Sequence, residues 1–209
     1  LRLTGEKGTA LVSAASFRNL FGYSQMRSTL ILSITGGEPL APGHFYDVGL
    51  SHLYRDAIQD MAAKGIIDGY SGDRAGFFGS DDPVTRQQFA KMITLTLGLE
   101  PLAAQFCPFS DVDVGWPYPQ GYIATAAHHG VTTGYEDNTY RPYANITRAQ
   151  VVTMVVRAAH GALEQAPSDY VGLLKYGDPT HGANIRTAEF NDLLDGITGS
   201  QDLPSDWDT

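Results

Sequence analysis

The chain has 209 residues, 43% of them hydrophobic and 18% charged, and its formal net charge is −9. This composition supports one substantial core or two small ones, and the negative charge, with no run of Lys and Arg, argues against general nucleic-acid binding. Cys107 is the single cysteine and no stretch approaches about 18 apolar residues, so we expect no internal disulfide, no cysteine zinc cluster and no transmembrane segment.

The N-terminal residues 1–35 differ in pattern from the rest of the chain. Residues 9–12 alternate weakly, residues 17–21 form a short apolar run with helical spacing, and residues 28–34 are rich in β-branched residues. These patterns predict a strand, a short helix and a second strand. The Gly- and Pro-rich residues 36–43 support neither helix nor strand, and therefore mark a domain boundary.

Residues 45–98 and 109–161 are two copies of one unit. FYDV at 45–48 matches FSDV at 109–112, KGIIDGY at 64–70 matches HGVTTGY at 129–135, and VTRQQF at 84–89 matches ITRAQV at 146–151. A repeat of this length indicates that the copies pack together and build a common surface. A weaker third copy follows, because Asp178 stands 131 residues after Asp47 and Gly196 stands 131 residues after Gly65. The second half of this third copy, with its Thr-Arg element, is absent.

Each full unit is predicted to fold as helix, tight loop and helix. The second helix begins with a capping box, in which a Thr N-cap is followed by Gln at the third helical position. The pairs are Thr85 with Gln88 and Thr147 with Gln150. Two such helices cannot bury an apolar face alone, so we expect the units to pack on one another.

Arg86 and Arg148 follow the two caps. A cation in the first turn lies at the positive end of the helix dipole, at a cost of about 0.3–1 kcal/mol. Two interpretations remain open. In the structural one, the arginine pairs with a nearby carboxylate and ties loop to helix; in the functional one, the guanidinium and free helix N–H groups bind an anionic ligand. The candidate carboxylates are Asp47, Asp81, Asp82 and Asp111.

Aromatic side chains are frequent around the predicted loops. Aromatic faces of this kind, such as those of Tyr70, Tyr135 and Trp116, suit sugar rings, although for any single residue packing in a small core is the more common use. Catalytic patterns are missing by contrast. No nucleophile elbow marks a serine, and His128 and Asp137 lack the partners that a metal site requires, so we predict no catalytic residue, metal or cofactor.

The repeated motifs resemble those of S-layer homology domains. The resemblance covers residues 44–163 well and residues 168–199 loosely. It implies a mainly α fold, in which three helix-loop-helix units form a pseudo-trimeric bundle. It also implies that a secreted protein is anchored non-covalently to the bacterial cell wall, by binding pyruvylated secondary cell-wall polysaccharide in grooves between units.

The resemblance also implies a set of ligand-binding residues. The binding arginine of the family falls on Arg86 and Arg148, its acidic residue on Asp47 and Asp111, and its first-helix tryptophan on Trp116; Thr85, Thr147, Tyr70 and Tyr135 complete the predicted set. The sequence departs from the family pattern at two places, which limits the predicted set. Residues 52–54 read His-Leu-Tyr where the family usually has His-Trp, and the third unit lacks its Thr-Arg element, which leaves at most two complete grooves.

Residues 12–30 are similar to the C-terminal edge of the stage II sporulation protein D family of peptidoglycan-cleaving enzymes, which implies a wall hydrolase as the parent protein. We therefore expect a small β or α/β segment at 1–37, full units at 44–100 and 108–163, and a truncated unit at 168–209. The alternatives to wall anchoring are a fragment of a peptidoglycan-remodelling enzyme and a self-assembling structural module. Cell-wall polysaccharide is the expected partner at the cell surface, with peptidoglycan and self-association as further candidates.

Overall fold

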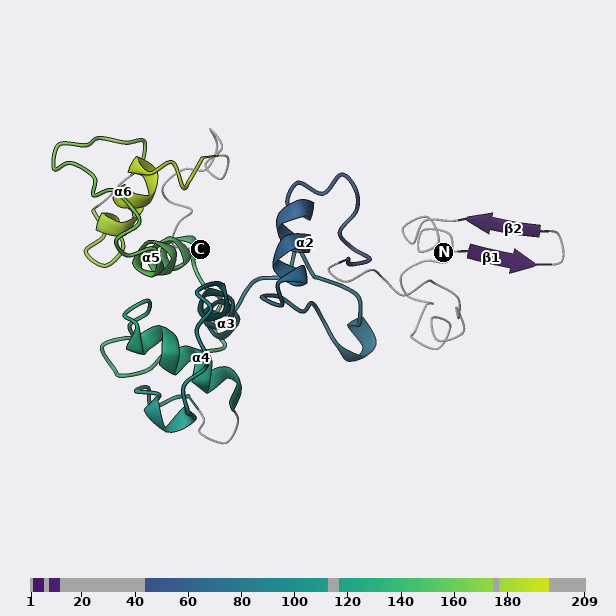
Figure 1. Cartoon of the computed structure of the whole chain (residues 1–209), viewed down its shortest axis with the longest axis horizontal. Helices are drawn as coiled ribbons and strands as arrows, with labels where there is room; N and C mark the ends of the chain where they lie inside the picture. The colour runs from purple at the N-terminus through teal and green to yellow at the C-terminus, as the bar shows by residue number, and fades with distance from the viewer. Residues whose placement is uncertain (1, 6–7, 12–43, 113–116, 175–176, 196–209) are drawn as a thin grey trace. The chain divides into compact units, whose positions relative to one another are not determined.

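The computed structural model describes residues 2–5, 8–11, 44–112, 117–174 and 177–195. These residues divide into two compact units, Leu1–Asp81 and Asp82–Thr209, called unit 1 and unit 2 below. The described part is mainly helical, which confirms the predicted fold class (Figure 1). The elements are β1 (Arg2–Gly5), β2 (Gly8–Leu11), α2 (Arg55–Ala63), η2 (Gly72–Arg74), α3 (Arg86–Thr96), η3 (Ala104–Phe106), α4 (Pro117–His128), α5 (Arg148–Ala158) and α6 (Gly182–Phe190). The pseudo-trimeric arrangement of three repeats stays a prediction.

Unit 1 contains a hairpin and the helix α2. Strands β1 and β2 pair antiparallel, with Arg2 opposite Leu11 and Gly5 opposite Gly8. The strand predicted at 9–12 corresponds to β2, whereas the predicted elements at 17–21 and 28–34 lie outside the described residues. In the first repeat, α2 buries Ile58, and residues on either side of the helix, Val48 and Ile66, are buried as well.

The repeated aspartate closes the loop of each full repeat. Asp47 accepts hydrogen bonds from the backbone N–H groups of Phe78 and Gly79, at 2.7 and 2.6 Å. In the second repeat, Asp111 accepts from the N–H groups of Tyr140 and Arg141, both at 2.7 Å. Each carboxylate thus accepts hydrogen bonds from two backbone N–H groups. The two sequence repeats therefore form the same loop structure.

A glycine in each loop leaves room for the repeated phenylalanine. A Cβ at Gly134 would lie 2.4 Å from the Phe109 ring and 2.6 Å from the carbonyl oxygen of Thr139. A Cβ at Gly69 would meet the Phe45 ring at 2.5 Å in the same way. The glycine is required here because the ring and the backbone approach too closely for any side chain.

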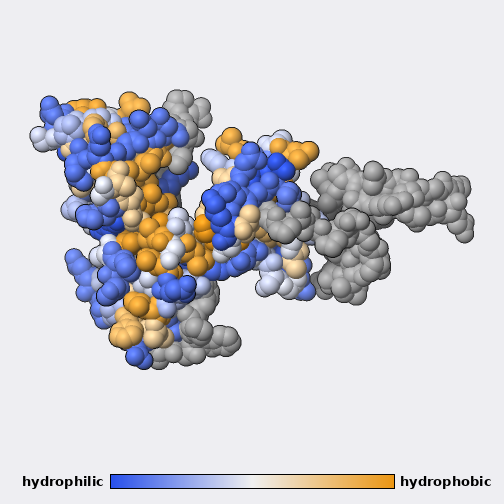
Figure 2. Space-filling view, viewed as in Figure 1, coloured by the Kyte–Doolittle hydropathy of each residue, from blue (hydrophilic) through white to orange (hydrophobic). Residues whose placement is uncertain are grey.

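Unit 2 is built by helices from neighbouring repeats. Helix α3, the second helix of the first repeat, packs on α4, the first helix of the second repeat; α5 packs on α6 in the same way, and α3 also contacts α5. Three clusters of buried residues join these helices, and Figure 2 shows further apolar residues at the surface near α3 and α5. The predicted packing of repeat on repeat is therefore confirmed within unit 2, and the boundary between the compact units falls inside the first sequence repeat.

Both predicted capping boxes are present. The Thr85 hydroxyl accepts from the N–H of Gln88 and the Gln88 side chain accepts from the N–H of Thr85; Thr147 and Gln150 repeat this exchange. The loop after α4 occupies two further N–H groups of α3. The N–H of Arg86 donates to the Ala144 carbonyl at 2.9 Å, and that of Gln87 donates to the Pro142 carbonyl at 3.0 Å. The functional interpretation of Arg86 assumed free helix N–H groups, whereas the neighbouring repeat occupies these two N–H groups of α3.

The guanidinium of Arg86 is tied to the same neighbouring loop. Arg86 is 4% exposed and its Nε donates to the carbonyl oxygen of Tyr140 at 2.8 Å. In return, the Tyr140 hydroxyl donates to the carbonyl oxygen of Arg86 at 3.1 Å, and the guanidinium carbon lies 4.4 Å from the centre of the Tyr140 ring. This structural tie uses a backbone carbonyl, whereas the sequence interpretation expected a carboxylate.

The third repeat uses its aspartate differently. The Asp178 carboxylate accepts from the N–H groups of Thr180 and His181, at 2.7 and 2.6 Å, just before α6. These bonds lower the pKa of Asp178. The repeat loop that this aspartate would otherwise close falls beyond residue 195, outside the described residues. Asp178 therefore organises the start of α6.

Replacing Gly134 with alanine should destabilise the protein by about 1–3 kcal/mol, because the new methyl group overlaps both the Phe109 ring and a backbone oxygen. Urea unfolding at neutral pH measures the change. Gly177→Ala is the matched control, since a Cβ there meets nothing within 4 Å. Equal free energies of unfolding for the two variants would contradict the steric explanation.

Tyr140 should make the fold sensitive to alkaline pH. Burial raises the pKa of Tyr140 to about 12, although Arg86 acts in the opposite direction. The unfolded chain releases this proton near pH 10 and the folded chain retains it, so stability is lost as pH rises above 10. We expect the wild type to lose about 1 kcal/mol more than Tyr140→Phe between pH 8 and pH 11 in chemical unfolding. Parallel losses in the two proteins would disprove the assignment.

Candidate functional site

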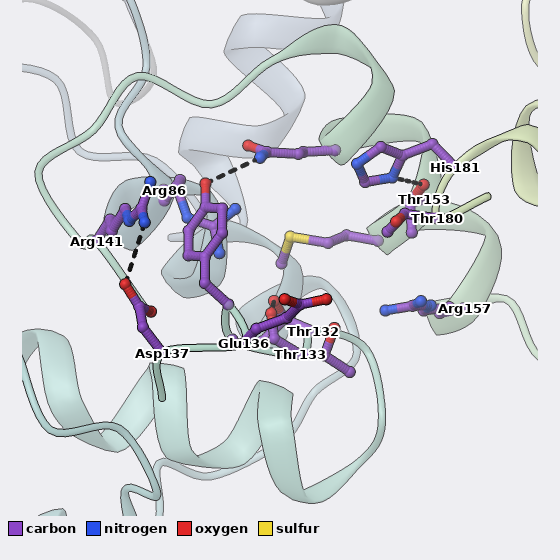
Figure 3. A pocket seen from close by; sticks show the side chains of 14 residues that line it. Arg86, Thr132, Thr133, Glu136, Asp137, Arg141, Thr153, Arg157, Thr180 and His181 are labelled. Carbon is purple, nitrogen blue, oxygen red and sulfur yellow. Dashed lines mark hydrogen bonds and ion pairs between the residues drawn. The ribbon is translucent and has the colours of Figure 1, made fainter. Parts of the chain in front are cut away.

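Unit 2 contains a pocket of about 560 Å³ lined by four parts of the chain. Arg86 comes from α3, and residues 132–137 with Arg141 come from the loop after α4. One face of α5 and the residues Thr180 and His181 before α6 complete the wall (Figure 3). All three sequence repeats thus contribute to a single pocket of a size that suits a small ligand.

Helix α5 supplies four lining residues that follow helical spacing. They are Gln150, Thr153, Met154 and Arg157. Positions separated by three, four and seven residues lie on one face of a helix. The Thr153 hydroxyl and the Nδ1 atom of His181 are hydrogen-bonded at 2.8 Å, which joins this face to the start of the third repeat.

Tyr135 is held between charged and polar groups. The guanidinium carbon of Arg141 lies 4.0 Å from the centre of its ring, and that of Arg86 lies 5.0 Å away. Its hydroxyl accepts from the side-chain amide of Gln150 at 3.2 Å. Two guanidinium groups therefore already lie over the ring on which a sugar would stack.

The charges of the pocket are arranged unevenly. Arg141 is paired with Asp137 at 3.2 Å, and hydrogen bonds from Thr139 and Arg141 lower the pKa of Asp137. Beyond this pair the lining holds two guanidinium groups, Arg86 and Arg157, against the single carboxylate of Glu136. The pocket is thus locally positive on a chain whose formal net charge is −9.

Arg86 is bonded to the protein through one nitrogen of its guanidinium and also lines the pocket. Only its Nε has a hydrogen-bond partner within the described residues, and Arg86 lines the pocket. Its terminal amino groups remain available to a ligand there. Arg86 therefore has a structural role through its Nε, and the functional interpretation depends on its terminal amino groups alone.

The structure separates the other predicted site residues from this pocket. Thr85 and Thr147 act as helix caps, and Asp111 binds backbone N–H groups. Arg148 is exposed and does not line the pocket. The loop that covers Arg86 belongs to the second repeat, and the corresponding loop for Arg148 would follow α6, beyond the described residues.

Two further predicted residues lie in unit 1, and a third is not among the residues that the structure describes. Asp47 closes the loop of unit 1, and Tyr70 of the same loop lies 3.8 Å from the guanidinium carbon of Arg74. Trp116 lies outside the described residues. Of the nine predicted residues, the pocket therefore contains Arg86 and Tyr135.

Sequence reasoning missed Arg141, Arg157, Glu136 and His181. The helical spacing from Gln150 to Arg157 was a usable signal, because it places a polar face on an otherwise apolar helix. The others come from segments without regular periodicity, and only the folded chain brings them together. In the described ranges, no group of three or more His, Cys, Asp or Glu side chains could hold a metal ion.

Comparisons with known proteins agree with the repeat analysis. An endoglucanase from Bacillus sp. (strain KSM-635) is 39% identical over 54% of this chain and 11% of its own length. A surface layer protein from Brevibacillus choshinensis is 34% identical over 48% of this chain and 9% of its own length. A cellulosome-anchoring protein from Acetivibrio thermocellus is 29% identical over 76% of this chain and 32% of its own length. The chain thus spans less than a third of each of these relatives.

The helices of the described ranges are all too short or too polar to cross a membrane. The S-layer homology domain family matches residues 44–90 and 108–152. These matched segments cover most of each of the two full repeats, so the repeated part of the chain is similar to S-layer homology domains.

Proposed function

We propose that the pocket of unit 2 binds an anionic cell-wall polysaccharide and thereby anchors a secreted protein to the bacterial cell surface. The observation that carries the proposal is the locally positive pocket of about 560 Å³, built by repeats of the S-layer homology family. The names of the relatives support it, since they include a surface layer protein, a middle cell wall protein and a cellulosome-anchoring protein.

The lining favours recognition by hydrogen bonds and charge. The Tyr135 ring already faces two guanidinium groups, so we do not assign it to stacking on a sugar. Threonine hydroxyls at 132, 133 and 180 and the open guanidinium groups match the hydroxyl and acidic groups of a polysaccharide. Binding of this kind weakens as ionic strength rises, because solvent-accessible charges are screened.

The acidic group that we propose is a pyruvyl ketal on the secondary cell-wall polysaccharide. A ketal carboxylate carries one negative charge next to a sugar ring, and can accept a forked pair of hydrogen bonds from a guanidinium. This specificity rests on the family resemblance together with the cations of the pocket.

Residues 1–37 carry a separate proposal, that the parent protein is a peptidoglycan-remodelling hydrolase which the repeats hold at the wall. It rests on the sequence similarity of residues 12–30 to the sporulation protein D family. A cleavage assay on purified peptidoglycan with the chain extended upstream tests it. Release of muropeptides would support it, and an inert extended protein would exclude it.

Cosedimentation with purified cell-wall sacculi tests the anchoring proposal. The protein should pellet with intact sacculi and stay in solution once the secondary polysaccharide has been removed, because the pocket recognises that polymer. Equal pelleting with stripped sacculi would instead indicate peptidoglycan as the partner. Pelleting without any sacculi would indicate self-assembly.

A bulky residue in the pocket should block binding. Thr133 is exposed and lines the pocket, so Thr133→Trp should lower the bound fraction about tenfold or more with little change in stability. Thr96→Trp is the matched control, since Thr96 is exposed at the end of α3 and does not line the pocket. Equal cosedimentation of the two variants would place the binding site elsewhere.

A further inference from the structure

Arg157 differs from the other two arginines of the pocket in its partners. Arg86 is bonded to the Tyr140 carbonyl and Arg141 is paired with Asp137. The guanidinium of Arg157, by contrast, has no hydrogen bond or ion pair to any residue that the structure describes, and it lines the pocket half-buried (Figure 3). A cation held there without a partner among the described residues is suited to an external anion.

The helix itself does not account for Arg157. A basic residue in the last turn of α5 interacts favourably with the helix dipole. The equivalent position of α3, nine residues after Arg86, is Leu95, and α3 forms without a basic residue in its last turn. The arginine is therefore specific to the helix whose face lines the pocket.

The surroundings of Arg157 limit the charge of the ligand. Glu136 also lines the pocket and is exposed. Its carboxylate would repel a second negative charge, and the chain as a whole is negative. A single carboxylate on an otherwise neutral sugar fits this balance better than a closely spaced polyphosphate.

We infer that Arg157 is the specificity-determining residue that binds the carboxylate of an acidic sugar, and that Arg86 is chiefly the structural base of the same pocket. The inference rests on the proposed polysaccharide binding and deepens it. It assigns the acidic group to a residue that the repeat motif does not contain, because the motif arginines are Arg86 and Arg148.

Calorimetric titration with two small probes tests the inference. The first probe is a hexose methyl glycoside that carries a pyruvyl ketal as the free acid, and the second is its neutral methyl ester. Wild type should bind the ester about tenfold or more weakly than the acid, the effect of losing one charge-assisted hydrogen bond. Arg157→Gln should bind the acid as weakly as the wild type binds the ester. Esterification should then cause little further loss in this variant, because the substitution and the ester remove the same contact.

Two further variants keep the test interpretable. Arg157→Lys retains the charge and should bind the acid with intermediate strength, because lysine lacks the planar fork. Arg148→Gln removes one positive charge from an exposed position of the same helix outside the pocket, and should bind like the wild type. Thermal unfolding midpoints of all variants verify that they are folded.

Several outcomes would overturn the inference. Wild-type affinity in Arg157→Gln would exclude Arg157, and additive losses from the mutation and the ester would show that Arg157 contacts another group. Failure of the wild type to bind the acid, with polymer-dependent binding to sacculi intact, would reject the carboxylate but leave the anchoring proposal standing. If sacculus binding is also absent, the anchoring proposal fails as well.

Discussion

The contact between Arg86 and the loop of the following repeat is the constraint on which unit 2 depends. The arginine is buried, and a cation without partners at such a position would be strongly unfavourable. The reciprocal bonds with Tyr140 and two π contacts compensate for this cost. The same contact fixes the loop that carries half of the pocket wall, so one side chain both stabilises the fold and lines the pocket.

Within unit 2, neighbouring repeats complete the hydrogen bonds and the packing of each other's helices. The N–H groups of α3 are satisfied by carbonyl oxygens of the next repeat, and the helices pack in the same staggered order. Arg148, whose following loop would lie beyond the described residues, is exposed, whereas Arg86 is buried. Asp178 differs from Asp47 and Asp111 as well, since its carboxylate accepts from the N–H groups just before α6.

Local signals in the sequence predicted the local structure well. Both capping boxes were predictable because each is complete within four residues, and the mainly helical fold followed from the spacing of apolar residues. The difference between Arg86 and Arg148 was not predictable in this way. Both follow the same cap, but the burial of Arg86 depends on a loop more than 50 residues away, as its bond to Tyr140 demonstrates.

The pocket was predicted only in part for the same reason. Arg86 and Tyr135 belong to the repeated motif and were identified, whereas Arg141, Arg157 and His181 lie outside it. These three come from a loop, the far end of a helix and the start of the third repeat. The motif contains the residues that the repeats share, whereas much of the pocket lining comes from residues that differ between the repeats.

The most direct test of this account is the free energy of unfolding of Arg86→Lys compared with Arg148→Lys. Both changes keep the charge and follow the same type of cap, but Arg86 is buried and bonds the Tyr140 carbonyl through its Nε, whereas Arg148 is exposed. We predict a loss of about 2 kcal/mol or more for Arg86→Lys, and a change within about 0.5 kcal/mol for Arg148→Lys. Equal effects of the two substitutions would contradict the central role of the Arg86 contact.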